Sequence, residues 1–357
     1  MYPELEINLS GIVENAKKMQ AMFDACGKKL CVVTKGMTRD IEIVHAITEN
    51  GISAICESHI QNFVLYKDIR AEKWLIREPM LSEIPLVVQY TDVSMNSELK
   101  TLIALNEEAK RQNKIHKVVL MYELGDRREG CDLQELTALT KEVLGMENLY
   151  LYGIGTNLSC YGAIIPDEEN MKELAETAEH IEKELGITLE LVSGGNSTSF
   201  EMFKDGLLPE KINNLRFGEA VFFGNVPCLE KKIEGFHTKN FVLRAQIVEI
   251  KEKPSLPKGS RGEVNTFGEA LPEYEDKGIR KRAILAVGKQ DVAVSGLRPR
   301  DTHAEVVGGS SDYIILDITE SPRPYQVGDV VEFDMNYSAV LETMCSNFIY
   351  KTYKKGM

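Results

Sequence analysis

The chain has 357 residues, of which 43% are hydrophobic and 27% are charged, and its formal net charge is −13. This length favours two domains, and no apolar run in the sequence is long enough to span a bilayer. Because phosphate binding needs a basic face, the acidic balance argues against nucleic acid as a partner.

Apolar runs that are typical of short strands alternate with helical patterns through the first 230 residues. The opening unit is Leu30–Val33, which is followed by Lys35, Gly36 and a helical pattern from Ile41. Both faces of this run are apolar, as in a buried parallel strand. Similar runs follow at 52–56, 73–77, 92–95, 117–122, 149–154, 189–192 and 215–217. Eight strands with mostly helical connections predict an α/β fold with a (β/α)8 TIM barrel over residues 1–230, in preference to an open doubly wound sheet.

The pattern changes after about residue 230. Strand-like runs at 242–248, 283–287, 313–317 and 330–333 are separated by turns that contain proline and glycine, and little helical periodicity remains. We therefore predict a second, mostly antiparallel β domain over residues 231–357.

The cysteines and the first residues bear on the compartment. Seven scattered cysteines include no Cys-x-x-Cys pair, which argues for reduced thiols and against a disulfide framework or a zinc site. The acidic start Met1–Glu6 lacks a signal-peptide pattern. These features predict a cytoplasmic protein without a metal site.

Lys35 stands where the first predicted barrel strand ends. The carboxyl ends of parallel strands carry the chemistry of such barrels. A lysine in a partly dry pocket loses part of its preference for the charged form, and its amine can then form a Schiff base with an aldehyde. The alternative is a strand-end lysine that extends its ammonium into water.

Three further segments carry candidate chemistry, each with a simpler alternative. The run 193–199 offers amides and hydroxyls to an anion such as phosphate, but a turn that caps the next helix would look the same. Arg216 lies in an apolar strand and needs a ligand or a structural ion pair. The two arginines of 123–130 could clamp a carboxylate, although a solvated loop is the more common explanation.

Five short motifs follow one another in a specific order. They are V-V-T-K-G (32–36), S-G-G-N-S (193–197), R-F-G-E-A (216–220), G-G-S-S-D (308–312) and D-M-N-Y-S (334–338). In this order they resemble the alanine-racemase-type fold of pyridoxal-phosphate enzymes, and within it the ornithine racemase branch. The resemblance implies a racemase that interconverts L- and D-ornithine by α-proton abstraction and reprotonation, and a head-to-tail homodimer.

The resemblance also implies roles for individual residues. Lys35 would form the Schiff base with pyridoxal phosphate and act as one acid/base at the substrate α-carbon. Arg216 would face the pyridine nitrogen, where a fixed cation disfavours protonation of the ring and restrains transamination and decarboxylation. Cofactor contacts are implied for Asn157, Asn196, Ser197, Thr198, Gly218 and Glu219, and substrate contacts for Arg128 and Ser311.

The sequence also departs from the alanine racemase pattern. Phe267 stands where those enzymes carry a tyrosine that serves as the second acid/base, so the proton donor for the opposite face is left open. Ser310, Ser311 and Ser346 replace other residues of the family, which predicts a substrate other than alanine. Asp291 could receive the side-chain ammonium of ornithine or lysine, or it could be an ordinary surface carboxylate.

Other functions stay open at this point. The enzyme could racemise lysine or alanine, or it could be a lyase of the D-threonine aldolase type, which shares the fold but usually needs a divalent metal. The sequence shows no clear His/Cys metal pair near its C-terminus. A non-catalytic protein of pyridoxal-phosphate homeostasis is a third alternative, but its relatives are single barrels and the predicted β domain argues against it.

Overall fold

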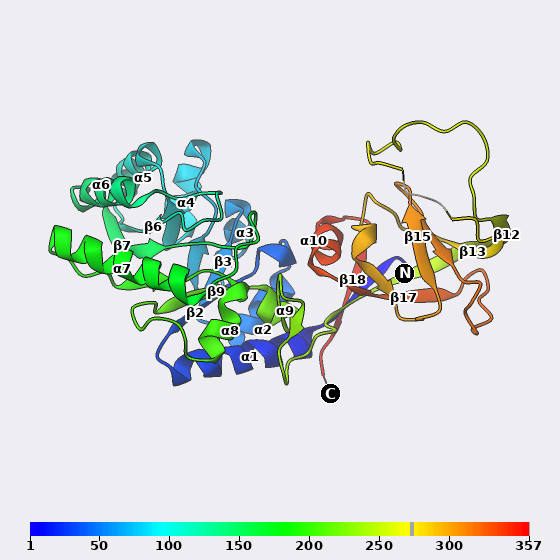
Figure 1. The fold of residues 1–357 in the computed structure, drawn as a ribbon. Helices are drawn as coiled ribbons and strands as arrows, with labels where there is room; N and C mark the ends of the chain where they lie inside the picture. The colour runs from blue at the N-terminus through cyan, green and yellow to red at the C-terminus, as the bar shows by residue number, and fades with distance from the viewer. Residues whose placement is uncertain (272–274, 357) are drawn as a thin grey trace. The chain divides into compact units, whose positions relative to one another are not determined.

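The structure is a computed structural model, and it describes residues 1–271 and 275–356. The chain divides into two compact units (Figure 1). The barrel unit runs from Leu9 to Asn240 and includes the last residues from Lys355, whereas the β unit combines Met1–Asn8 with Phe241–Lys354.

The barrel unit contains a closed sheet of eight parallel strands. Each strand pairs with the next along the chain, and the last strand pairs back with the first through contacts such as Cys31 with Arg216. The strands are β2 (Lys29–Val33), β3 (Ala54–Glu57), β4 (Glu72–Leu75), β5 (Val93–Asn96), β6 (His116–Met121), β7 (Leu149–Gly155), β8 (Leu191–Ser193) and β9 (Asn214–Phe217). The predicted (β/α)8 barrel is therefore confirmed.

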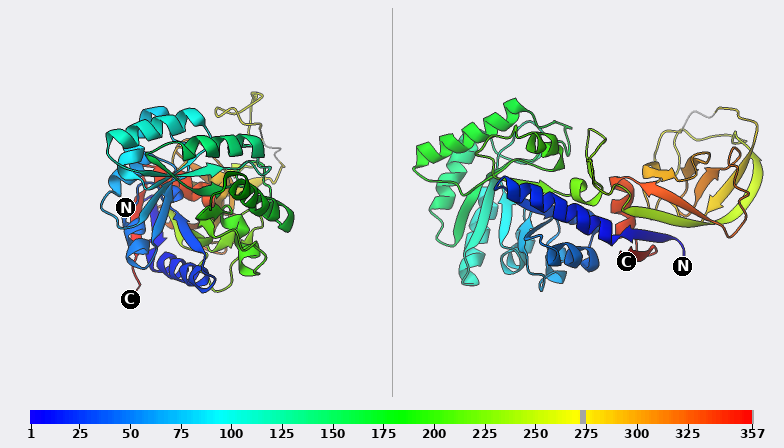
Figure 2. Two further views of the ribbon diagram at one scale, coloured as in Figure 1. Left: turned by 90° about the vertical axis from the view of Figure 1, so that its left-hand side faces the viewer. Right: turned by 90° about the horizontal axis from the view of Figure 1, so that it is seen from below.

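Helices surround the barrel strands, as the views in Figure 2 show. In α1, the buried residues Ile12, Ala16, Met19 and Phe23 recur every three or four positions and so form one apolar face. The helices are α1 (Leu9–Ala25), α2 (Ile41–Glu49), α3 (Ile60–Leu65), α4 (Ile84–Tyr90), α5 (Leu99–Arg111), α6 (Leu133–Leu144), α7 (Glu168–Leu185), α8 (Phe200–Lys204) and α9 (Glu219–Phe222). A small hairpin of β10 (Asn225–Val226) and β11 (Lys231–Lys232) follows α9.

The β unit is built on one mostly antiparallel sheet, as predicted. Its main path runs in the order β14-β17-β12-β13-β16-β15, and β1 pairs antiparallel with β12 and parallel with β18. The strands are β1 (Glu4–Asn8), β12 (Phe241–Pro254), β13 (Ile279–Leu285), β14 (Leu297–Pro299), β15 (Glu305–Gly309), β16 (Ile314–Asp317), β17 (Val330–Met335) and β18 (Tyr350–Lys354).

Two features of the β unit differ from the sequence prediction. A single boundary after residue 230 does not describe the units, because β1 buries Leu5 and Ile7 within the sheet of the β unit. The unit also contains a helix, α10 (Tyr337–Cys345), which begins where the Asn336 side chain accepts a hydrogen bond from the Ala339 amide at 3.0 Å.

None of the helices in the described part of the chain has the length and apolar character that crossing a bilayer requires.

Candidate functional site

The predicted site residues of the barrel unit follow the carboxyl ends of its strands. Lys35 lies two residues after β2, and Gly218 directly follows β9. Because the strands are parallel, their carboxyl ends meet at one mouth of the barrel. The other predicted residues of this unit lie after β6 (Arg128), after β7 (Asn157), after β8 (Asn196, Ser197 and Thr198) and at the start of α9 (Glu219).

Lys35 opens a tight turn at the end of β2. The turn is a single 3-10 segment, Lys35–Met37, in which the Met37 amide donates to the Thr34 carbonyl oxygen at 2.8 Å. Asp40 then starts α2 by accepting a hydrogen bond from the Ile43 amide at 3.1 Å. The lysine is thus held at the mouth of the barrel by a short, well-capped connection.

Ser197 joins the loop after β8 to the end of β9. Its Oγ accepts hydrogen bonds from the amides of Gly218 at 3.1 Å and Ala220 at 3.2 Å, and Glu219 lies between them in the chain. A Cβ at Gly218 would lie only 3.0 Å from the Val33 carbonyl oxygen, so the close approach of Gly218 to the end of β2 favours glycine. The result is a group of backbone amides and a hydroxyl that suits an anion.

Three of the predicted residues meet in one hydrogen-bond network after β7 and β8. The Asn196 side chain accepts hydrogen bonds from the Thr198 amide at 2.9 Å and from the Thr198 hydroxyl at 2.8 Å. Its Nδ2 donates to the Leu158 carbonyl oxygen at 2.7 Å and to Asn157 Oδ1 at 3.3 Å. Asn196, and not a serine or threonine, therefore caps the turn that leads to α8.

Arg216 is 3% exposed and points into the barrel at the level of Cys31 and Cys56. Its Nη2 donates to the Thr156 carbonyl oxygen at 2.7 Å, and its Nη1 donates to the Ser193 hydroxyl. Burial lowers the pKa of the guanidinium. Among the residues that the structure describes, no carboxylate forms an ion pair with Arg216, so its charge is stabilised by dipoles. The simpler alternative, a structural ion pair, is therefore not found in residues 1–271 and 275–356.

Arg128 is exposed and is already paired. It forms an ion pair with the adjacent Glu129, and this hydrogen bond raises the pKa of the guanidinium. Arg127 is occupied in the same way, by Glu123 at 2.6 Å. A substrate carboxylate at Arg128 would therefore compete with Glu129.

Asp291 and Ser311 lie on neighbouring loops of the β unit. The Gln290 amide donates to the Ser311 carbonyl oxygen at 3.1 Å. Asp291 is only 5% exposed and accepts a hydrogen bond from the Ser346 hydroxyl at 2.6 Å, so it is not a surface carboxylate in this chain. The Ser311 hydroxyl donates to Asp312 at 2.8 Å.

Phe267 also lies in the β unit, and it is half exposed. The Lys289 ammonium sits 4.5 Å from the centre of its ring and pairs with Glu269. Phenylalanine has no titratable proton, so Phe267 does not serve as the second proton donor.

Sequence reasoning missed a buried carboxyl group beside Lys35. Glu57, the last residue of β3, is 0% exposed and accepts hydrogen bonds from the Thr34 hydroxyl at 2.6 Å and from Asn62 Nδ2 at 2.9 Å. Burial raises the pKa of Glu57 to about 7. A polar residue at the end of the apolar run 52–56 is the same signal that identified Lys35, and it could have identified Glu57 too.

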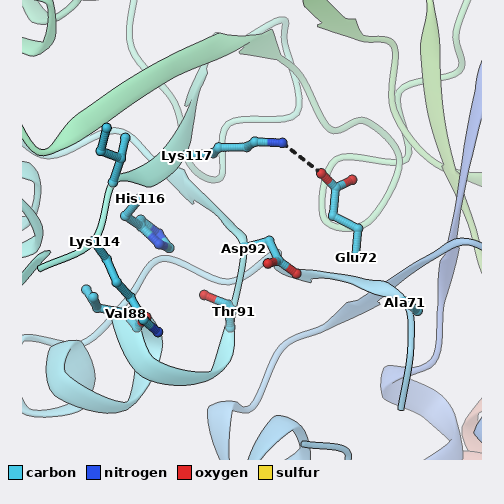
Figure 3. Close-up of a pocket in the computed structure, with 9 residues that line it drawn as sticks. Ala71, Glu72, Val88, Thr91, Asp92, Lys114, His116 and Lys117 are labelled. Atoms are coloured by element: carbon cyan, nitrogen blue, oxygen red, sulfur yellow. Dashed lines mark hydrogen bonds and ion pairs between the residues drawn. The ribbon is translucent and has the colours of Figure 1, made fainter. Parts of the chain in front are cut away.

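A pocket of about 430 Å³ lies at the opposite end of the barrel, near the amino ends of β4, β5 and β6 (Figure 3). Its polar side chains are engaged with neighbouring groups. Lys117 pairs with Glu72 at 3.2 Å, Lys114 donates to the Val88 carbonyl oxygen at 2.8 Å, and His116 lies 2.9 Å from the Ser94 hydroxyl. These contacts indicate that this end stabilises the barrel. In such barrels the active site usually lies at the other end, where the carboxyl ends of the strands meet.

His116 makes the stability of the fold depend on pH. Burial lowers its pKa from 6.5 to about 4, so the unfolded chain binds this proton first as the pH falls. Because of His116, we expect the free energy of unfolding to fall by about 3 kcal/mol between pH 6.5 and pH 4, at about 1.4 kcal/mol per pH unit. Denaturant unfolding at several pH values checks this: His116→Gln should flatten the loss over that interval, whereas a variant of an exposed histidine, His45→Gln, should not. An equal acid slope in His116→Gln would contradict the assignment.

Comparison with known protein families places residues 7–226 in one of them. This stretch matches the family model described as "Alanine racemase, N-terminal domain". The chain is 44% identical to ornithine racemase of Acetoanaerobium sticklandii over 98% of this chain and 99% of that protein. It is 37% identical to lysine racemase of Thermotoga maritima over the whole of both proteins.

Solved structures share the fold at lower identity. Alanine racemase from Streptomyces lavendulae has a TM-score of 0.76 and 15% identity, with 99% of this chain and 97% of that chain covered. Alanine racemase from Bartonella henselae, solved with covalently bound pyridoxal phosphate, has a TM-score of 0.71 and 18% identity, with 98% and 99% covered. D-threonine aldolase from Filomicrobium marinum has a TM-score of 0.74 and 14% identity, with 99% and 92% covered. The fold is thus common to racemases and an aldolase.

Proposed function

Because this chain belongs to the alanine racemase N-terminal domain family, we propose that it is a pyridoxal-phosphate-dependent racemase that interconverts L- and D-ornithine. The observation that carries the proposal is the 44% identity to ornithine racemase along nearly the full length of both proteins. In this proposal, residues at the mouth of the barrel hold the cofactor and move the α-proton on one face of the substrate.

The described residues fit pyridoxal phosphate. The phosphate needs hydrogen-bond donors, which we propose are the Ser197 hydroxyl and the Glu219 amide, with Asn196 and Thr198 beside them. The Gly218 amide would join them by exchanging its hydrogen bond to Ser197 Oγ for one to the phosphate. The ring nitrogen needs a polar neighbour, and Arg216 is a buried cation without a carboxylate partner in the described part of the chain. In our proposal Asn157 lies beside the ring.

When bound, pyridoxal phosphate supplies the electron sink that makes the α-proton of an amino acid acidic. Lys35, at the end of β2, holds the cofactor and moves the α-proton on one face of the substrate. The fixed charge of Arg216 disfavours a proton on the ring nitrogen, which limits side reactions.

Substrate recognition is proposed to involve Arg128, Ser311 and Asp291. Arg128 receives the α-carboxylate by exchanging Glu129 for it, and Ser311 assists. Asp291 receives the side-chain ammonium by exchanging the Ser346 hydroxyl for a charged partner. A cationic substrate agrees with the relatives, which are named for ornithine and lysine.

We further propose that the enzyme works in the cytoplasm as a homodimer. The support for a dimer is the family resemblance, in which a partner subunit completes the site. Light scattering of the purified chain measures its mass directly, and a monomer that is fully active would contradict this part of the proposal.

Exchange of the α-proton in deuterated water tests the reaction. The holoenzyme is incubated with L- or D-ornithine, and deuterium at Cα is followed by NMR while the enantiomers are separated by chiral chromatography. We expect exchange and racemisation with ornithine, less with lysine and least with alanine. The same protein stripped of its cofactor is the control. Failure to exchange the α-proton of any amino acid would overturn the proposal.

The fold match to D-threonine aldolase keeps one second candidate. No group of three or more His, Cys, Asp or Glu side chains in the described residues is arranged to hold a metal ion. Cleavage of D-threonine that depends on added divalent metal, in a protein that leaves ornithine unchanged, would favour the lyase. Tight binding of the cofactor without turnover of any amino acid would instead favour a homeostasis protein, a reading that the β unit disfavours.

A further inference from the structure

Glu57 and Lys35 are neighbours at the ends of adjacent strands. In the register of β2 and β3, Val33 pairs with Cys56, so the next residues, Thr34 and Glu57, lie side by side. The Thr34 amide continues the ladder by donating to the Cys56 carbonyl oxygen at 2.9 Å, and the Thr34 hydroxyl donates to the Glu57 carboxyl at 2.6 Å. The Glu57 carboxyl is therefore held against Thr34, the residue that precedes Lys35 in the chain.

The hydrogen-bond partners of the Glu57 carboxyl are neutral. They are the Thr34 hydroxyl, the Asn62 amide and the backbone of Ser58. Within the described residues, no lysine, arginine or histidine forms an ion pair with it. The nearby cation that acts on this carboxyl is Lys35, whose charge lowers the pKa of Glu57 against the larger effect of burial. Solvent screens a buried carboxylate less than a surface one, so its charge reaches a neighbouring cation more effectively.

Two other titratable groups lie near Glu57, and neither supplies a positive charge as Lys35 does. Cys56 is buried in the barrel, and Tyr66, at the end of α3, has a pKa that burial and Glu57 both raise. Both groups are therefore neutral near pH 7. Asp40 raises the pKa of Tyr66 and Arg39 lowers it, so the effects of these two charges oppose each other.

Resting on the proposed function, we propose that Glu57 is a positioning residue for Lys35. Its carboxylate, held by Thr34 and Asn62, favours a positive charge on the Lys35 nitrogen and so sets the pH range in which that nitrogen carries its proton. Glu57 acts through Lys35 and does not itself exchange a proton with the substrate.

The test is a pH titration of the holoenzyme's near-ultraviolet and visible absorbance, which reports the protonation of the nitrogen that joins Lys35 to pyridoxal phosphate. In Glu57→Gln, the loss of the negative charge should move the titration midpoint down by about one pH unit. Glu57→Asp keeps the charge and should stay closer to the wild-type midpoint. Circular dichroism establishes that each variant is folded.

A second buried carboxyl provides the matched control. Glu83 is 5% exposed and pairs with Arg77 at 2.7 Å and Gln61 at 3.0 Å. Glu83→Gln should leave the midpoint unchanged even if it lowers stability. A wild-type midpoint in folded Glu57→Gln, or equal shifts in Glu57→Gln and Glu83→Gln, would overturn the role of Glu57. An absorbance band that is missing from the wild type, or that persists in Lys35→Ala, would instead overturn the proposed function.

Discussion

Lys35→Ala is expected to lose at least about 10³-fold in the rate of ornithine racemisation, because it removes both the amine that holds the cofactor and one acid/base group. The absorbance band of the bound cofactor should disappear with the activity. Chiral chromatography measures the first effect and spectrophotometry the second.

Lys110→Ala is the control for this variant. Lys110 lies in the last turn of α5 and is exposed, so its loss should change neither the rate nor the spectrum. Racemisation by Lys35→Ala at a rate near that of the control would refute the assignment of the lysine, whatever the spectrum shows.

Arg216→Gln is expected to lower the racemisation rate by about 10²-fold, since it removes a buried, preorganised charge. Without that cation the ring nitrogen takes up a proton more readily, so the share of transamination should rise. The loss of hydrogen bonds to Thr156 and Ser193 should also cost about 1–3 kcal/mol of stability.

The ratio of oxo acid formed to amino acid racemised measures the effect of Arg216 on reaction choice. Arg216→Lys keeps a positive charge and should hold this ratio nearer to the wild-type value, although a lysine cannot reproduce both hydrogen bonds of the guanidinium. If the ratio is the same in Arg216→Gln as in the wild type, the cation does not control the side reaction.

The barrel was predictable from the sequence because each of its strands is a short apolar run between helical patterns. In the structure Leu30, Cys31 and Val32 are buried, so both faces of the strand are covered, and Val33 is partly buried. The positions of Lys35 and Ser197 followed from the same logic, since residues that end parallel strands gather at one mouth. Local sequence also marks the start of α6, where Asp132 and Glu135 form a capping box.

Other features could not be predicted, because they depend on contacts between distant segments. The pairing of β1 with β12 and β18 joins residues that are more than 200 positions apart, and no local pattern encodes it. The partners of Arg216 lie at the ends of two other strands, so the residues around it in the sequence favoured a structural ion pair and did not indicate these neutral partners. The burial of Asp291 likewise depends on Ser346, which is far along the chain.

The place of β1 has a consequence for the order in which the chain folds. During synthesis the first eight residues emerge long before β12 and β18, the strands that pair with them. Until those strands arrive, β1 exposes unpaired backbone groups and the apolar side chains Leu5 and Ile7. The strands of the barrel are all present by residue 240, whereas the sheet of the β unit needs residues up to Lys354. Nascent or truncated chains that stop near residue 240 therefore carry an unpaired strand that is prone to aggregate.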